Sequence, residues 1–200
     1  YQIKPIIEGM KKMKKDNVIF VSFSSPSGMN YAISDAIDLK FYLPFDFPWT
    51  IQKVLTMVKP KKVIFSTYDI WPNFVWFCKT KNIHLNVMSA KIEHHSIKHR
   101  PFVMNFYKSL YKLFDTIYAI TEKDKNRFDR MVGSEVKPIV SSLGNPRFDS
   151  IFNDSKEFID SKPTIQDREQ IILIGSSHSR DDLILIPALI NLMTDFPKLR

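Results

Sequence analysis

Polar side chains gather where apolar stretches of this chain end. In residues 62–73 (KVIFSTYDIWPN), the apolar run Val63–Phe65 gives way to polar residues and then to Trp71-Pro72-Asn73. This order predicts a buried strand, a polar turn and a helix with proline in its first turn. Loops at the carboxyl ends of parallel strands form the ligand crevice of open α/β sheets. We therefore expect Asp69 to present a carboxylate to such a crevice, or else to cap the following helix.

Three other turns deliver polar side chains in the same way. Residues 24–28 (SSPSG), 89–91 (SAK) and 144–149 (GNPRFD) each follow an apolar run. Because parallel strands all point the same way, we expect these turns to meet at one edge of the sheet. Their hydroxyls, carboxylates and cations suit a hydroxylated, phosphorylated or carboxylated ligand. The candidate ligand-binding residues are Ser25, Ser27, Gly28, Asp69, Asn73, Ser89, Lys91, Asn145, Arg147 and Asp149.

Structural roles also account for several of these residues. Ser-Pro-Ser-Gly consists of residues that favour turns, so it also fits a turn that binds no ligand. Arg147 and Asp149 are spaced to form a surface ion pair of little energetic value. Trp71 and Trp76 are residues that build a core more often than they form a stacking platform.

A further turn, Gly175–His178 (GSSH), follows the very apolar run Ile171–Ile174. A glycine and two hydroxyls ahead of a helix suit phosphate binding at the helix N-terminus, so Ser176, Ser177 and His178 are candidates. They do not form a catalytic pair of the GxSxG kind. The chain has no GxGxxG or GxxxxGK[ST] motif and no nucleic-acid-binding motif, which argues against nicotinamide, P-loop and nucleic-acid functions.

Three histidines, His94, His95 and His99, lie in the basic segment Lys91–Arg100. A zinc site needs further ligands at helical or hairpin spacing, and the chain has neither HExxH nor paired cysteines. We therefore predict no metal site. The segment is better interpreted as a positively charged loop that holds an anionic group or is solvated surface.

Composition indicates an ordinary soluble protein with a basic surface. The 200 residues are 44% apolar and 25% charged, and the net charge is +8. Such a charge favours acidic partners, but the lysines are spread over short clusters, so basicity alone selects no partner. The one cysteine, Cys78, excludes a disulfide framework and suits a small buried side chain. No apolar run has the ~18 residues of a membrane span, so we expect neither a membrane-spanning helix nor a signal peptide within these 200 residues.

Strands alternate with helices along the chain, which predicts an α/β fold with a doubly wound parallel sheet. A second strand–turn–helix unit after a polar connection indicates a second α/β domain. We predict an N-terminal Rossmann-like domain over residues 1–149, a connection over 150–168 with room for one helix, and the start of a second domain over 169–200. Helical pattern at both ends, without an initiator Met, leads us to expect a fragment. The expected strands are 18–23, 41–43, 63–66, 84–88, 116–120, 138–142 and 171–174, and the expected helices are 3–15, 29–36, 51–58, 71–81, 102–114, 122–132 and 183–193.

The order of these turns resembles a known family. Six segments carry the resemblance: Phe23–Gly28 (FSSPSG), Phe41–Asp46 (FYLPFD), Tyr68–Asn73 (YDIWPN), Ser89–Lys91 (SAK), Gly144–Asp149 (GNPRFD) and Gly175–His178 (GSSH). In this order they resemble the 3-deoxy-D-manno-octulosonic acid (Kdo) transferases of lipopolysaccharide biosynthesis, which are glycosyltransferases of GT-B fold.

The resemblance implies inverting, metal-independent transfer of Kdo from CMP-Kdo to a sugar hydroxyl of a lipid A precursor, with no cofactor. The N-terminal domain would bind the acceptor and the C-terminal domain the nucleotide donor. The protein would lie at the cytoplasmic face of the bacterial inner membrane. The net positive charge of the chain suits an acceptor that carries phosphates.

Two positions carry supporting catalytic roles by resemblance. Asp69 occupies the acidic position before Trp-Pro, where the family more often has Glu. Arg147 occupies the basic position of the Gly-Asn-x-Lys-Phe-Asp segment. Many members have a second Glu where this chain has Thr67. The family's general base, a Glu in a Gly-Glu pair, would precede Tyr1, and its main CMP-binding residues would follow Arg200, so we expect the 200 residues alone to be inactive.

Two alternatives remain from the sequence. One is another GT-B enzyme, a nucleotide-sugar transferase or epimerase. The other is a non-enzymatic module that binds anions or a membrane surface through the lysine clusters.

Overall fold

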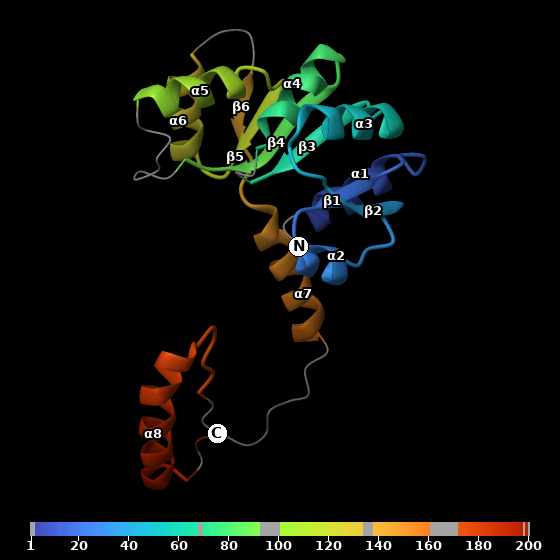
Figure 1. The fold of residues 1–200 in the computed structure, drawn as a ribbon. Coiled ribbons are helices and arrows are strands. Elements are labelled where there is room, and N and C mark those ends of the chain that lie inside the picture. Colours follow the sequence, from blue (N-terminus) through green and yellow to red (C-terminus); the bar gives the residue numbers. More distant parts are fainter. Residues whose placement is uncertain are drawn as a thin grey trace. The chain divides into compact units, whose positions relative to one another are not determined.

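Strands and helices alternate along the chain, as the sequence pattern predicts (Figure 1). The computed structural model describes residues 3–67, 70–92, 101–133, 138–160, 172–197 and 199. The strands are β1 (Phe20–Phe23), β2 (Leu39–Tyr42), β3 (Lys62–Ser66), β4 (His84–Ala90), β5 (Thr116–Ala119) and β6 (Ile139–Ser142). The helices are α1 (Lys4–Met13), α2 (Pro26–Tyr31), α3 (Pro48–Val58), α4 (Pro72–Thr80), α5 (Pro101–Tyr111), α6 (Glu122–Val132), α7 (Pro146–Asp160) and α8 (Ser179–Asp195).

The chain divides into two compact units, Tyr1–Ser155 and Lys156–Arg200. The first unit contains two parallel sheets, one of order β1-β2 and one of order β3-β4-β5-β6. The predicted α/β fold with parallel strands is therefore confirmed. The predicted continuous sheet is divided in two, because β1 is hydrogen-bonded to β2 and β3 to β4, but β1 and β3 are not paired with each other.

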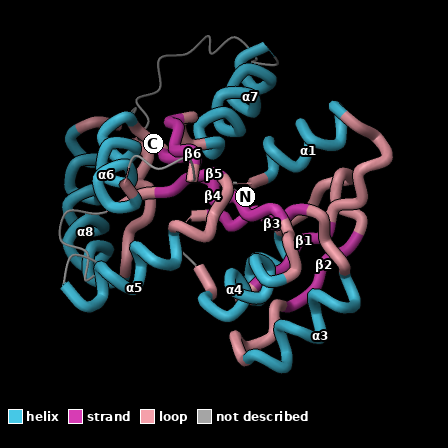
Figure 2. The backbone as a smooth tube through the Cα atoms, turned by 90° about the horizontal axis from the view of Figure 1, so that it is seen from above, coloured by secondary structure: helices cyan, strands magenta, loops and turns pink. Residues whose placement is uncertain are grey.

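The core lies around the four-stranded sheet, whose strands are flanked by helices (Figure 2). Leu85, Val87 and Ile117 are fully buried, as expected for parallel strands that are covered on both faces. The Phe65 ring meets those of Phe74 and Phe114 edge-on, with centroids 5.6 and 5.7 Å apart. Cys78 is buried among these residues, and burial raises the pKa of its thiol to about 12, so its predicted role as a small core residue is confirmed.

Two helices begin earlier than predicted, each at a proline. α2 starts at Pro26, inside the turn expected over 24–28, because the Ser25 hydroxyl caps it by accepting the Gly28 N–H at 3.2 Å. α3 starts at Pro48 rather than after Thr50. Proline suits the first helical position, where no intrahelical partner for an N–H is needed.

The largest differences lie at the C-terminal side. α7 extends through Asp160 and so includes the one helix that the sequence allowed within the connection, but it begins earlier, at Pro146. Residues 172–174, predicted as part of a buried strand, form no strand, and Leu173 is exposed. A strand requires a continuous row of hydrogen bonds to a neighbour, and among the described residues of the second unit only Leu199 takes part in a β-bridge. α8 continues through Pro187, where the sequence predicted a break or a start. Within the described ranges, no helix has both the length and the apolar character needed to span a membrane.

Asp38 ties the first helix to the two-stranded sheet. Its carboxylate accepts hydrogen bonds from Lys11 Nζ at 2.8 Å and from the Ile19 N–H at 2.7 Å. The hydrogen bond from Lys11 and that from Ile19 lower the pKa of the carboxyl group below its ordinary value. A group whose pKa is lower in the folded state stabilises the fold above its unfolded pKa, and this contribution is lost as the pH falls through the folded pKa.

We predict that Asp38→Asn lowers the melting temperature at neutral pH and that the difference from the native chain shrinks as the pH falls below about 4, the ordinary pKa of Asp. Thermal unfolding across this pH range tests it. Asp16→Asn, at an exposed carboxylate, is the matched control and should have little effect at any pH. A pH-independent effect of Asp38→Asn would contradict the role assigned to its charge.

Candidate active site

The carboxyl ends of β3 and β4 lie side by side and present two hydroxyl residues. Ser66 and Met88 are register partners, and the Thr67 N–H donates to the Met88 carbonyl at 2.8 Å. Thr67 and Ser89, which directly follow these partners, are therefore neighbours. The sequence predicted that Ser89 would lie at this edge, and β4 brings it there, although the strand runs on to Ala90.

Both residues adopt the left-handed backbone region, with φ of 62° at Thr67 and 53° at Ser89. This region costs an L-residue about 1–2 kcal/mol, and it is rare for a β-branched side chain such as Thr. Ser89 is buried, and its backbone coincides with a shift in the register of β4 against β5 between Val87 and Ala90. Strained backbone of this kind clusters at functional sites, so the two adjacent outliers mark this edge as a candidate active site.

Asp69, the predicted catalytic carboxylate, lies with Tyr68 outside the described residues. Its catalytic role therefore stays a prediction. The structure does describe both sides of the pair, at Thr67 and Ile70.

Asp46 holds the start of α4, the helix that follows Asp69 in the chain. One oxygen of its carboxylate accepts the N–H of Asn73 at 2.9 Å and the other that of Phe74 at 3.0 Å. Its carbonyl accepts a hydrogen bond from Asn73 Nδ2 at 2.6 Å. Trp71, the residue in the N-cap position, supplies no side-chain hydrogen bond. A carboxylate 27 residues away in the sequence thus does the work of a helix cap.

This arrangement changes two interpretations made from the sequence. Asp46 was not selected as a functional residue, because a cap contributed across 27 residues leaves no local signal. The N–H groups that Asp69 was expected to cap in the alternative interpretation are bonded to Asp46 instead. Asn73, predicted to bind substrate, uses its amide nitrogen to hold the loop of Asp46.

The segment after β4 is anchored at its beginning. The Arg127 guanidinium donates from Nη1 to the Ile92 carbonyl at 2.6 Å and lies 3.5 Å from the buried Asp124 carboxylate. Lys91, a predicted ligand-binding residue, is exposed beside the buried Ile92. Residues 93–100, with all three histidines of the basic segment, lie outside the described residues. In the described ranges, no three His, Cys, Asp or Glu side chains are grouped to hold a metal ion.

Ser25, Ser27 and Gly28 follow β1 of the two-stranded sheet, where Ser25 is the N-cap of α2 and the other two lie in its first turn. The Ser25 and Ser27 hydroxyls lie 3.3 Å apart, and Ser25 also caps α2. A Cβ at Gly28 would lie 2.6 Å from Cδ1 of Phe23, so glycine allows α2 to approach the end of β1. These contacts give Ser25 and Gly28 a structural role. An apolar hollow nearby is lined by residues that include Ile7 and Val21 and by none of the predicted site residues.

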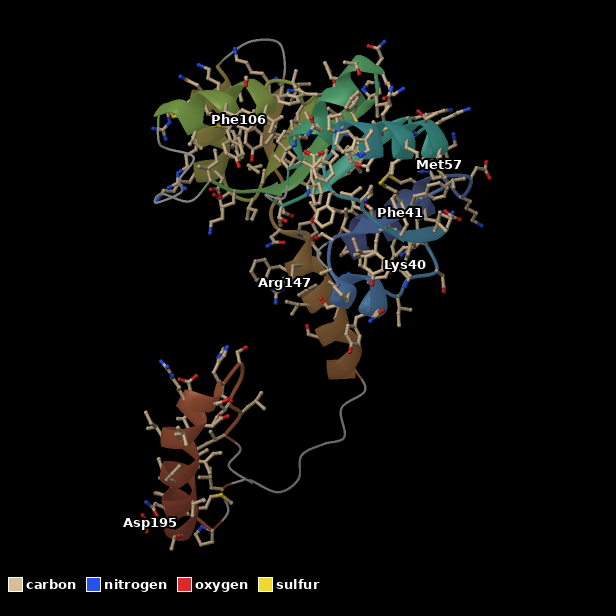
Figure 3. All side chains as sticks on the ribbon, in the orientation of Figure 1. Lys40, Phe41, Met57, Phe106, Arg147 and Asp195 are labelled. Atoms are coloured by element: carbon tan, nitrogen blue, oxygen red, sulfur yellow. The ribbon has the colours of Figure 1, made fainter. Side chains whose placement is uncertain are left out.

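Asn145 and Arg147 follow β6, at the opposite edge of the four-stranded sheet from β3. Gly144 takes a φ of 82°, and Asn145 Oδ1 accepts the Arg147 N–H at 3.1 Å, which shapes the first turn of α7. The Arg147 side chain is exposed on α7 (Figure 3) and makes no ion pair with a described residue, so the surface pair with Asp149 is not formed. β6 lies two strands from β4, a spacing of about 10 Å.

Ser176, Ser177 and His178 belong to the second unit, ahead of α8. Ser176 has a φ of 61°. The His178 N–H donates to Asp181 Oδ2 at 3.0 Å, and His178 Nδ1 lies 3.8 Å from the same oxygen. All three residues are exposed, as the predicted phosphate-binding role requires, and that role stays a prediction.

We predict that Asp46→Ala lowers the free energy of unfolding by about 1–2 kcal/mol, because two N–H groups of α4 lose their acceptor. Asp46→Asn, which retains one acceptor oxygen, should have a smaller effect. Urea denaturation measures both. Asp35→Ala, at an exposed carboxylate, is the control, and an equal change in it would exclude the capping role.

We predict that Thr67→Gly raises the free energy of unfolding by about 1 kcal/mol, because glycine adopts positive φ without strain. Ser66→Gly, one residue earlier in ordinary strand geometry, should instead lower it by about 0.5–1 kcal/mol. If both variants lose stability equally in the same denaturation experiment, Thr67 is not strained.

The chain matches the family described as 3-deoxy-D-manno-octulosonic-acid transferase (kdotransferase) over residues 1–150. It is 26% identical to the transferase of that name from Aquifex aeolicus over 183 residues, which cover 90% of this chain and 44% of that protein. It is 25% identical to the one from Chlamydia trachomatis serovar D over 142 residues, or 70% of this chain and 33% of that protein. The chain thus spans less than half the length of these relatives.

Two solved structures with a similar arrangement of strands and helices hold a nucleotide sugar and a nucleotide. The UDP-GlcNAc 2-epimerase from Neisseria meningitidis, solved with UDP-GlcNAc bound, has a TM-score of 0.65 at 15% identity, covering 99% of this chain and 60% of that one. MnaA of S. aureus, solved with UDP, has a TM-score of 0.63 at 14% identity, covering 99% and 56%. At these identities the likeness shows the fold, which is the Rossmann-like GT-B type that the sequence predicted. Since the family match covers 150 of the 200 residues, the chain belongs to the Kdo transferase family.

Proposed function

We propose that this chain forms the acceptor side of a glycosyltransferase that transfers Kdo from CMP-Kdo to a lipid A precursor in lipopolysaccharide biosynthesis. The observation that carries the proposal is the family match over residues 1–150. The two strained hydroxyl residues at the ends of β3 and β4 support it, because they mark the edge of the sheet at which GT-B proteins bind their ligands.

In the proposed reaction, an acceptor hydroxyl attacks the anomeric carbon of Kdo while the bond to the CMP phosphate breaks, and the configuration at that carbon is inverted. A general base takes the hydroxyl proton, and negative charge develops on the departing phosphate. Arg147 is suited to stabilise this charge, since its guanidinium is exposed and makes no ion pair with a described residue. Asp69 would support the transfer from the acceptor side. No metal is required in this scheme.

The acceptor carries phosphates and is anchored in a lipid layer. A net charge of +8 favours such an acceptor, and Lys91 places a cation directly after the end of β4. We accordingly propose that the protein works at the cytoplasmic face of the bacterial inner membrane.

An epimerase of the same fold is the second candidate, favoured by the likeness to the Neisseria meningitidis enzyme. An epimerase changes the configuration of its nucleotide sugar and forms no bond to an acceptor. The two functions are therefore distinguished by whether the sugar becomes attached to the lipid.

The test is an assay of the full-length protein with CMP-Kdo and a lipid A precursor, with the product followed by mass spectrometry. We expect attachment of Kdo to the lipid. We expect no turnover of CMP-Kdo by the 200 residues alone, because they span 33–44% of the relatives' length. Conversion of UDP-GlcNAc without an acceptor, and no Kdo product, would favour the epimerase. Turnover by the 200 residues alone would overturn that part of the proposal.

Substitution of Arg147 tests the role that the proposed reaction assigns to this residue. Arg147→Ala in the full-length protein should lower kcat about a hundredfold, the usual cost of removing one group that stabilises transition-state charge. Arg147→Lys, which restores the charge found in the family's pattern, should recover most of it. Arg130→Ala, at an exposed arginine of α6, is the control. Equal kcat values for Arg147→Ala and the control would exclude the assigned role.

A further inference from the structure

Helix α6 begins between two loops at the carboxyl edge of the four-stranded sheet. It follows β5, and β5 lies between β4 and β6 in that sheet. The loop after β4 carries Lys91, and the loop after β6 leads to Arg147 in the first turn of α7. The first turns of α6 are therefore placed to contact both loops, whose cations the proposed reaction assigns to the acceptor and to the departing phosphate.

A buried ion pair of α6 holds the loop after β4. Asp124 is only 4% exposed, and its carboxylate lies 3.5 Å from Nη1 of Arg127. The same nitrogen donates to the carbonyl of the buried Ile92 at 2.6 Å. The Thr121 hydroxyl donates to the other oxygen of Asp124 at 2.6 Å and accepts the N–H of that residue at 3.1 Å. The Asp124 carboxylate is thus fixed from two sides, and it fixes the guanidinium that binds the carbonyl next to Lys91.

The backbone of Lys91 is held on both sides. The carbonyl of Ala90, before it, accepts the Ile120 N–H at 3.1 Å, and the carbonyl of Ile92, after it, accepts from Arg127. Lys91 itself is exposed between these two anchored groups. A buried ion pair adds little net stability, because the cost of desolvating its charges offsets much of their attraction. The contribution of the pair in α6 is therefore geometric, since it fixes the point at which the chain leaves β4.

The first residue of α6, Glu122, holds the loop after β6. Its carboxylate accepts a hydrogen bond from the hydroxyl of Ser142, the last residue of β6. Two residues further on, the Gly144 N–H donates to the carbonyl of Ile120 at 3.1 Å. Gly144, at positive φ, begins the turn that leads to Arg147. The exit of the chain from β6 toward Arg147 is thus bonded to the residues that lead into α6 and to its first residue.

We propose that the first turns of α6 position both cations of the candidate active site: Arg127, paired with Asp124, sets the place of Lys91, and Glu122 sets that of Arg147. The proposal rests on the proposed function, which assigns Lys91 to the acceptor and Arg147 to the departing phosphate, and it names the residues that hold them. Arg127 and Glu122 are positioning residues, because they act through the two loops and not on the substrates. Since each holds a different loop, each affects a different kinetic constant.

Amide hydrogen exchange in the full-length protein tests the first contact without any substrate. Arg127→Lys keeps a charge beside Asp124 on a shorter side chain, so the buried carboxylate stays paired while the carbonyl of Ile92 loses its donor. We expect exchange about fivefold faster over residues 89–92, the change that corresponds to one hydrogen bond, and unchanged over residues 142–145. Arg127→Gln with Asp124→Asn removes both charges, so no charge is buried alone, and should give the same result.

The second contact should respond in the opposite way. Glu122→Ala should speed exchange about fivefold over residues 142–145 and leave residues 89–92 unchanged. Glu122→Gln, which keeps an acceptor oxygen for Ser142, should restore native exchange. Lys123→Ala and Arg130→Lys, at exposed residues of the same helix, are the controls and should change neither segment.

Kinetics of Kdo transfer separate positioning from a general structural role. Arg127→Lys should raise the KM of the acceptor about fivefold at unchanged kcat, whereas Glu122→Ala should lower kcat about fivefold at unchanged KM. Double-mutant cycles show whether each acts through its cation. Arg127→Lys should have no further effect on KM when Lys91 is already replaced by Ala, and Glu122→Ala no further effect on kcat in Arg147→Ala.

Unchanged exchange in both segments, or faster exchange in both for either variant, would overturn the inference. So would a protein that transfers Kdo with native kcat and KM in both variants, or effects that persist in full when Lys91 or Arg147 is already replaced. If the native full-length protein transfers no Kdo, the proposed function fails, and the exchange measurement still decides whether α6 holds the two loops. The two failures are therefore distinguishable.

Discussion

The hydrogen bonds between Asp46 and the start of α4 are the interaction on which the rest of the first unit depends. β1 and β2 form one sheet and β3 to β6 another, without pairing between them. Asp46 belongs to the loop after β2, and its partners Asn73 and Phe74 belong to the helix after β3. The same carboxylate therefore links the two sheets, caps a helix and fixes the loop after β2. Because buried N–H groups must be paired, this role cannot be lost without a cost at all three places.

The candidate active site is built from backbone as much as from side chains. Thr67 and Ser89 hold positive φ on neighbouring strands, and the ladder between β3 and β4 keeps them there, since the Thr67 N–H is bonded to Met88. A regular strand would send consecutive side chains to opposite faces of the sheet. The left-handed residues break that alternation near the ends of β3 and β4, where the chain leaves the sheet. Strain of this kind persists only where the surrounding structure enforces it.

Helix ends and strand positions that depend on neighbouring residues could be predicted from the sequence. Contacts between residues distant in the chain could not. α6 spans the predicted residues 122–132, because Thr121, whose hydroxyl caps it, and Gly133, which ends it, are both adjacent to the helix in the sequence. Apolar runs located the six observed strands to within a few residues. The cap contributed by Asp46 and the left-handed backbone of Ser89 escaped prediction, since each is imposed by partners distant in the chain. Of the strand expected at residues 171–174, the described residues 172–174 form none, because an apolar run becomes a strand only where it is hydrogen-bonded to a neighbouring strand.

The exposure of the rings of Phe45, Phe47 and Trp49 is likewise imposed by hydrogen bonds of the loop that carries them. Folding by itself would bury them, because apolar surface is driven out of water. Instead, the hydrogen bonds of Asp46 and Thr50 stabilise a loop conformation in which the rings are exposed. The aromatic loop and the start of the helix that follows β3 are therefore held in place by one residue, Asp46, because its carboxylate bonds to Asn73 and Phe74 of that helix.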